Sequence, residues 1–402
     1  MTEPVVIDVF AGGMNNMSPV DRLPEGQVRD LLNLDPVGGG ALQLRAGRDK
    51  CADLGSVHGA VPYGDGFLLA AGEDLIRFSA ATNEARVIGQ VAASGGLCGA
   101  ELNGDAFLCS AVSAMRVRGD QVGAWGLPEI YPRVTVGVGT MPAGIYRVAV
   151  TAMDAFSAES GAAPLVVTLT EPGSIELLWV APAGAASCRV YASVANGETL
   201  YLQADGVTGG HTIESVRDDS ARLMTGNLVP PPVAAQIVAY KSRLLLVAGS
   251  AVWITEPFAP HLVNMAHGFV HYGAAVDMIA ATDGGVFIAA GQKTYFLTNP
   301  GMPESAQPTV LEFGAVRGSG VTLPDGRAAW MTRYGQAFGA PDGSVQLPQR
   351  EKYSPQIASG ASVGVVDGNG VQMLVTTMKG PTRDSVIGVA DSFDLEIEYA
   401  NS

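Results

Sequence analysis

The sequence predicts an all-β protein: a β-propeller of five to seven blades with an inserted β-sandwich and an extended N-terminal arm. The 402 residues include 51 glycines and 24 prolines, beside dense Val, Thr and Ala, and this composition favours strands and tight turns over helices. An apolar hairpin also recurs about every 35 to 45 residues, apart from one large gap. We expect four parts: an arm (residues 1–50), propeller (51–129), insertion (130–217) and propeller again (218–402).

The arm is rich in residues that form turns. Four residues near its start tolerate the positive φ angles of tight turns: Gly12, Gly13, Asn15 and Asn16. Residues 27–34 are expected to form two helical turns before Asp35-Pro36. Nothing in this segment has the pattern of a catalytic site, so an organisational role is indicated.

Arginine is concentrated in the same arm. The whole chain has only 24 Lys and Arg against 39 Asp and Glu, yet four arginines fall here: Arg22, Arg29, Arg45 and Arg48. We expect the arm to dock onto another subunit or protein. Its polar anchors would be Arg22, Arg29 and Arg45, and its turn would be fixed by Asn15 and Asn16.

The repeated unit is a turn with Gly beside Asp or Asn, an apolar strand, often a Gly, and a second strand. Six copies cover residues 63–78, 102–117, 240–255, 282–297, 323–338 and 365–378. A propeller blade requires a wholly apolar inner strand, because that strand is buried between neighbouring blades. Similar hairpins also build β-sandwiches and barrels, which remain the alternative. Three segments are expected to be closing strands: 372–375, 386–389 and 394–398.

The gap at residues 130–217 has a different pattern. Tyr146, Val148 and Val150 alternate toward one face, as do Cys188 and Val190, which is typical of sandwich strands. The segment resembles a fibronectin type III or related immunoglobulin-like module on these residues: Gly144, Tyr146, Val148, Val150, Glu159, Ser160, Pro164, Trp179, Pro182, Gly184, Arg189, Val190, Tyr191 and Tyr201. We expect Trp179 in its core. A proline run, 230–232, follows as a semi-rigid spacer.

Charge and composition limit the classes of partner. A net charge of −15 without any Lys and Arg cluster argues against a protein that grips duplex DNA. A channel lined with carboxylates would instead let a polyanion slide. Only 16% of residues are charged and 47% are hydrophobic, which suits a surface covered by neighbouring subunits.

The start of the chain lacks the basic and apolar pattern of a secretory signal, and no stretch of 18 apolar residues occurs. We therefore expect synthesis in the cytoplasm and no membrane insertion. Four scattered cysteines lack the spacing of a zinc site or disulfide framework, and buried reduced thiols are expected: Cys51, Cys98, Cys109 and Cys188.

Candidate chemistry is sparse, and no cofactor is indicated. His261, His267 and His271, with Asp277, are the one cluster suited to metal or acid–base work, but they lack the HExxH spacing. The alternative places these histidines on a surface loop or at a subunit contact. Asp-Gly pairs are interpreted as hairpin turns rather than calcium loops. A propeller-type glycosidase would need two facing carboxylates, which a sequence does not exclude.

The arm resembles the start of bacteriophage tail proteins, namely the hub, nozzle or DNA-stabilisation proteins of short tails. The matching residues are Gly13, Asn15, Asn16, Leu23, Pro24, Gly26, Arg29, Asn33, Leu34, Asp35, Gly40, Leu42, Arg45 and Gly47. The resemblance implies a non-enzymatic virion protein that forms a homohexameric ring around the DNA channel, contacts the tail adaptor and tail fibres, and retains and then releases the genome. The alternatives are a receptor- or glycan-binding tail protein and an envelope polysaccharide hydrolase.

Overall fold

The computed structural model describes residues 9–32, 34–36, 40–44, 50–93, 95–356, 358–368 and 371–380. The chain divides into two compact units. One consists of Ala52–Tyr272, and the other consists of Met1–Cys51 together with Gly273–Ser402.

Strands dominate the described residues, which contain no α-helix and only short 3-10 turns such as η1 (Val20–Arg22); the predicted all-β class is confirmed. The two helical turns predicted at 27–34 are wrong. Gln27 and Val28 form β2 (Gln27–Val28), which pairs in parallel with β1 (Gly13–Met14). A helix of two turns is marginal in water, so the strand pairing prevails. Within the same described ranges, no helix is long and apolar enough to cross a membrane.

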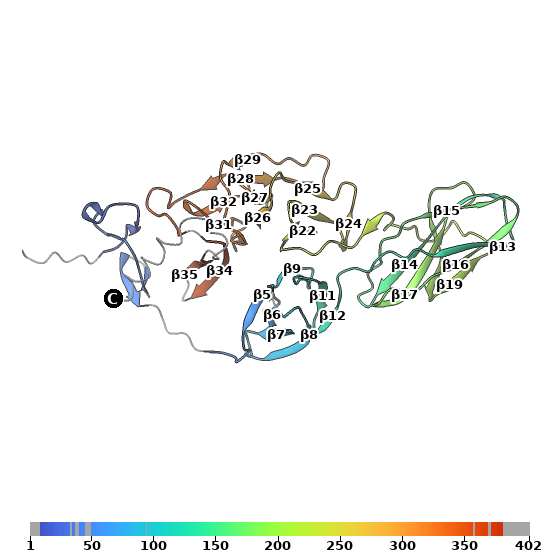
Figure 1. The fold of residues 1–402 in the computed structure, drawn as a ribbon, viewed down its shortest axis with the longest axis horizontal. Coiled ribbons are helices and arrows are strands. Elements are labelled where there is room, and N and C mark those ends of the chain that lie inside the picture. The colour runs from blue at the N-terminus through green and yellow to red at the C-terminus, as the bar shows by residue number, and fades with distance from the viewer. Residues whose placement is uncertain are drawn as a thin grey trace, which may run out of the picture. The chain divides into compact units, whose positions relative to one another are not determined.

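Outside residues 133–213, the unit Ala52–Tyr272 contains three antiparallel sheets, of which the first two are four-stranded meanders in chain order. The first contains β5 (Val57–Tyr63), β6 (Gly66–Ala71), β7 (Asp74–Ser79) and β8 (Ala85–Gln90). The second contains β9 (Cys98–Leu102), β10 (Asp105–Cys109), β11 (Ala114–Arg118) and β12 (Gln121–Ala124). The third contains β20 (Leu228–Val229), β21 (Gln236–Tyr240), β22 (Arg243–Ala248), β23 (Ala251–Glu256), β24 (Ala259–Asn264) and β25 (Phe269–His271). Figure 1 shows these three sheets in blue, cyan and yellow.

Strand β10 explains why one strand of each repeat is almost wholly apolar. All five of its residues are buried. Ala106 and Leu108 pack into the core shared with β5, β6 and β7, whereas Phe107 and Cys109 pack on the opposite face against residues of β21 and β22. A strand with both faces covered keeps no polar face, so it loses the usual alternation of apolar and polar residues. The turn before it, Asn103-Gly104, has positive φ at both residues, as a two-residue hairpin requires.

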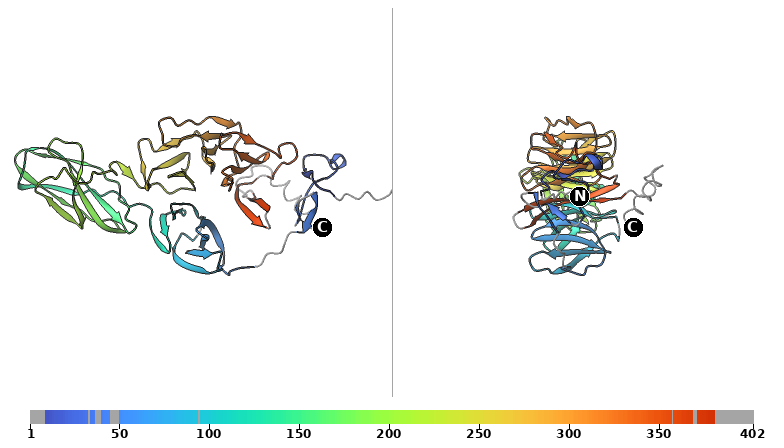
Figure 2. Two further views of the ribbon diagram at one scale, coloured as in Figure 1. Left: turned by 180° about the vertical axis from the view of Figure 1, so that it is seen from behind. Right: turned by 90° about the vertical axis from the view of Figure 1, so that its left-hand side faces the viewer.

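The segment between the second and third sheets forms two layers. A three-stranded sheet in the order β13-β16-β19 faces a four-stranded sheet in the order β15-β14-β17-β18. The strands are β13 (Arg133–Met141), β14 (Gly144–Asp154), β15 (Leu165–Leu169), β16 (Gly173–Leu178), β17 (Ala185–Ala192), β18 (Tyr201–Val207) and β19 (Gly210–Ile213). Both sheets supply one core that includes Tyr146, Val148, Val150, Cys188 and Trp179, the residues that the sequence assigned to it. We call this body the sandwich; Figure 2 shows its two layers from behind.

The second unit contains two more four-stranded meanders and a hairpin. The strands are β26 (Val276–Ala281), β27 (Val286–Ala290), β28 (Lys293–Leu297) and β29 (Thr309–Leu311); β30 (Val321–Thr322), β31 (Ala328–Thr332), β32 (Gly335–Gly339) and β33 (Val345–Gln346); and β34 (Gly360–Gly368) with β35 (Val371–Lys379). Phe287 and Trp330 stack at 4.8 Å between the two meanders. Gly339 makes room for them, since a Cβ there would lie 2.2 Å from the Phe287 ring.

The arm belongs to this second unit and adds a hairpin of β3 (Leu34–Pro36) and β4 (Leu42–Leu44). Of the three predicted closing strands, residues 372–375 lie in β35. The segments 386–389 and 394–398 lie outside the described residues.

Candidate subunit-docking site in the N-terminal arm

Asn15 fixes the turn at the base of the arm. Its side-chain oxygen accepts hydrogen bonds from the backbone N–H groups of Met17 (3.2 Å) and Ser18 (3.0 Å). Its Nδ2 donates to Ser18 Oγ at 3.0 Å and to Gln27 Oε1 at 2.6 Å. The residue is 4% exposed, and a buried amide that uses both of its ends in this way holds the loop in one conformation.

Asn16 has a different role from the one expected, because it ties the arm to a distant part of its own chain. Its backbone N–H donates to the carbonyl of Lys352 at 3.0 Å. Its Nδ2 donates to the carbonyl of Ser354 at 2.8 Å, and its Oδ1 accepts from the N–H of Ser354 at 2.8 Å. Asp30 of the arm also lies near Tyr353, where burial first and then the Asp30 charge raise the pKa of the phenol.

The three predicted arginine anchors differ in their surroundings. Arg29 donates to the carbonyl of Ser18 at 3.2 Å and so supports the Asn15 turn. Arg22 is exposed, with Asp21 at 3.9 Å as an ion-pair partner. Arg45 lies outside the described residues. Arg22 is therefore a described arginine that the arm presents to solvent.

Large apolar side chains of the arm are exposed as well. The exposed fraction is 82% for Leu32, 75% for Leu44 and 74% for Val20. An arm held at its base by Asn16 thus carries apolar side chains and Arg22 outward. Apolar groups beside a polar rim are typical of protein interaction sites.

The sequence did not predict the contacts that fasten the sandwich to the neighbouring sheets. Phe156, from the loop after β14, lies under the guanidinium groups of Arg116 (4.9 Å) and Arg118 (5.6 Å) on β11. Both arginines also hydrogen-bond the carboxylate of Asp105 on β10. Burial raises the pKa of Asp105, but the hydrogen bonds from Arg118 and Arg116 outweigh it and the pKa is lowered. One signal was available: the arginines alternate on one strand beside an aspartate that starts the previous strand.

The three histidines go to separate partners. His261 is buried and bonds the carbonyl of Glu159 at 2.9 Å. His271 bonds the Ser250 hydroxyl at 3.0 Å, and His267 is exposed. Burial of His261 contradicts a surface-loop position for that residue. In the part of the chain that the structure describes, no group of three His, Cys, Asp or Glu side chains is placed to hold a metal ion.

The cysteines also differ from the expectation of four buried thiols. Cys109 and Cys188 are buried, Cys98 is half-buried and Cys51 is exposed. Cys51 lies in the segment before the first meander.

No protein-family model and no curated protein matches the chain. Among solved structures, it is similar to an extracellular domain from B. thetaiotaomicron, of a protein described as a one-component system; the TM-score is 0.25 at 9% identity over 79% of this chain and 58% of that chain. It is also similar to PorZ, a surface component of the type-IX secretion system of Porphyromonas gingivalis, with a TM-score of 0.24 at 11% identity over 82% of this chain and 51% of PorZ. The chain spans little more than half the length of these proteins, and such TM-scores carry no inference about its role.

Proposed function

We propose that this chain is a structural virion protein, a ring-forming subunit of the distal tail (nozzle or hub) of a bacteriophage. In this proposal the four-stranded meanders are blades of one propeller, the sandwich is a fibronectin-like insertion, and six copies surround the DNA channel. The ring extends the conduit, helps to retain packaged DNA and opens on adsorption. Its neighbours are the tail adaptor and the tail fibres, and it has no catalytic role.

Two features of the sheets support the propeller part of this proposal. Neighbouring sheets share cores face to face: the first meander with the second, the second meander with the sheet β20–β25, and the two meanders of the other unit with each other. Inner strands such as β10, β27 and β31 are buried along their whole length. Propeller blades pack in this way around an axis.

The proposed assembly of six copies into a ring is supported by the N-terminal arm. Asn16 donates two hydrogen bonds and accepts a third, and these hold the base of the arm on its own unit, while Val20, Leu32 and Leu44 remain exposed. Exposed apolar residues on an anchored segment gain stability by packing against a neighbouring copy, which is how a heterologous contact closes a ring. The net charge of −15 suits a channel that DNA passes through without binding.

The arm is tested by changing its exposed apolar residues rather than by deleting it. The triple variant V20S/L32S/L44S should fold as the wild type does, because all three side chains face solvent. A matched control, V112S/F258S/M302S, removes three exposed apolar side chains elsewhere. Native mass spectrometry should show hexamers for the wild type and the control, and monomers for the arm variant. Hexamers of the arm variant, or a wild type that remains monomeric, would contradict the proposal.

A second candidate, binding to a receptor or glycan of the host surface, is favoured by the sandwich. Strand β13 lies at the edge of its sheet, and its side chains Val136 and Val138 are exposed. An exposed apolar edge strand is a ready site for a partner. Particles that carry V136K/V138K should assemble normally, and a loss of adsorption by these intact particles would support this candidate over a purely structural role.

A further inference from the structure

Two cysteines that are distant from any predicted site lie opposite one another in the second meander. Cys98 begins β9, Cys109 ends β10, and the antiparallel register pairs the two residues directly. Directly opposed residues point to the same face of a sheet with Cβ atoms about 5 Å apart. A disulfide needs Cβ atoms about 4 Å apart. With this register kept, a small movement of the two strands toward each other therefore brings the two sulfur atoms into bonding distance.

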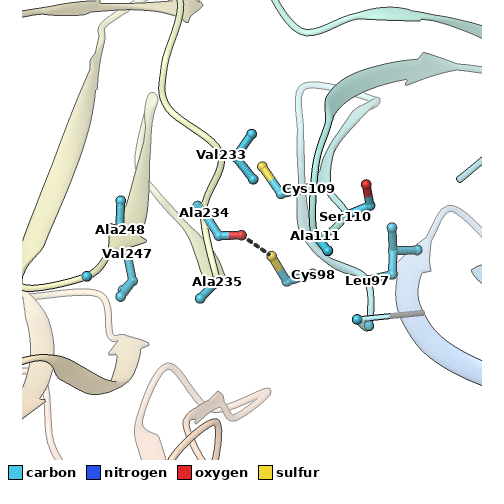
Figure 3. A pocket seen from close by; sticks show the side chains of 13 residues that line it. Leu97, Cys98, Cys109, Ser110, Ala111, Val233, Ala234, Ala235, Val247 and Ala248 are labelled. Atoms are coloured by element: carbon cyan, nitrogen blue, oxygen red, sulfur yellow. Dashed lines mark hydrogen bonds between the residues drawn. The ribbon is translucent and has the colours of Figure 1, made fainter. Parts of the chain in front are cut away.

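A cavity gives small molecules access to the pair. It has a volume of about 440 Å³ and is lined by both cysteines and by small residues, including Gly95, Ala111 and Ala248. Figure 3 shows Cys98 and Cys109 reaching from their strands toward the segment at Val233 and Ala234. Cys98 Sγ donates a hydrogen bond to the carbonyl of Ala234 at 3.3 Å. The thiols thus lie at the wall of a space that admits a reagent.

The two thiols are not equivalent. The neighbouring Cys109 thiol, and then burial, raise the pKa of Cys98, whereas the neighbouring Cys98 thiol lowers the pKa of Cys109. We therefore assign the attacking thiolate to Cys109, the thiol whose pKa is lowered. Cys98 keeps its proton until a second step.

We propose that Cys98 and Cys109 form a redox-active dithiol, a modification site that a small-molecule disulfide converts to a cross-strand disulfide. The Cys109 thiolate attacks one sulfur of the reagent R–S–S–R, expels R–S⁻ and forms a mixed disulfide. Cys98 then loses its proton, attacks Cys109 Sγ and expels the second R–S⁻. The protein loses two electrons and two protons, and the reagent is reduced to two R–SH molecules.

Oxidation has a defined structural consequence. The disulfide leaves Cys98 without a proton on Sγ, so its hydrogen bond to Ala234 is lost. That bond joins β9 to the residues just before β21, that is, two neighbouring sheets with a shared core. The oxidation state therefore sets one of the contacts between these sheets.

Glutathione disulfide tests this site on the full-length chain. The exposed Cys51 is first replaced in a C51S variant, so that it does not react. After titration, acid quenching and alkylation, peptide mass spectrometry should find the 98–109 disulfide, reversible by dithiothreitol, while the buried Cys188 stays alkylatable only after denaturation. The variant C51S/C98S should instead trap glutathione on Cys109.

Two results would overturn the site. Both thiols could remain free in folded C51S at every glutathione disulfide concentration, or C51S/C98S could take up no glutathione at Cys109. If C51S/C98S does not fold, the peptide mass spectrometry of C51S alone decides whether the disulfide forms. Circular dichroism of each variant establishes which case applies.

Discussion

His261 on β24 donates a hydrogen bond from Nε2 to the backbone carbonyl of Glu159 in the sandwich, 2.9 Å away. The residue ties two parts of the unit Ala52–Tyr272 together. Burial, with a smaller contribution from the charge of Arg116, lowers the pKa of His261 below its usual value of 6.5. The imidazole is therefore neutral in the folded protein at neutral pH.

This gives a prediction about acid stability. Between the lowered folded-state pKa and the unfolded value near 6.5, the unfolded chain binds more protons than the folded one, so stability falls as pH drops through that window. The variant H261Q retains a donor but does not titrate, and its stability should depend less on pH between 7 and 5. Urea unfolding at each pH measures this. If the dependence of stability on pH is the same in H261Q, the effect belongs to other groups such as His211. Burial lowers the pKa of His211 as well.

Asp105 should contribute strongly to the free energy of unfolding. The variant D105N leaves the buried Arg116 without its carboxylate, and removing one partner of a buried pair costs about 3–5 kcal/mol. The control D120N breaks the exposed pairs with Arg77 and Arg86 and should cost only about 0–1 kcal/mol. Urea denaturation compares the two. Equal losses would show that burial of the Asp105 pair does not matter.

Asn16 should hold the arm in place. N16A removes the two side-chain hydrogen bonds to Ser354, each worth about 1 kcal/mol or less at an exposed site. Hydrogen exchange should therefore speed up at Ser354 and across β1 while the meanders stay unchanged. R22A, at an exposed residue of the same arm, is the control. Faster exchange throughout the protein would mean that Asn16 has a global rather than a local role.

The variant V138K tests whether the edge strand β13 of the sandwich is exposed to solvent. Its side chain is fully exposed on β13, so V138K should change the free energy of unfolding by less than about 0.5 kcal/mol. A lysine on an edge strand discourages strand pairing between molecules, and light scattering at high concentration should show less association. The matched variant V148K, at a fully buried position of β14, should unfold the sandwich. A large stability loss in V138K would indicate that this edge is covered.

The all-β class and the core of the sandwich could be predicted from the sequence, because both depend on the spacing of apolar residues along the chain. Alternation at Tyr146, Val148 and Val150 is a local signal, and the structure places all three in one core. Strands that are buried on both faces, such as Asp105–Cys109, could also be predicted. Burial on both faces removes the alternating polar positions, and only the first residue of this strand is polar.

The contacts between distant segments were not predictable in this way. Asn16 was expected to fix a local turn, but its partners are more than 330 residues away in the sequence. The bond from His261 to Glu159 and the pairing of Cys98 with Cys109 depend on which strands become neighbours. Such pairs leave no periodic pattern in a single sequence, so the partners of Asn16 and of His261 could not be predicted from it.

The central claim is the position of this protein in a virion. Particles whose genome encodes the chain should be labelled with a gold-conjugated antibody against the sandwich and imaged by electron microscopy. The proposal predicts label in a ring at the distal end of the tail, with six sites in end-on views. Label on the fibres, or no label on intact particles, would contradict it.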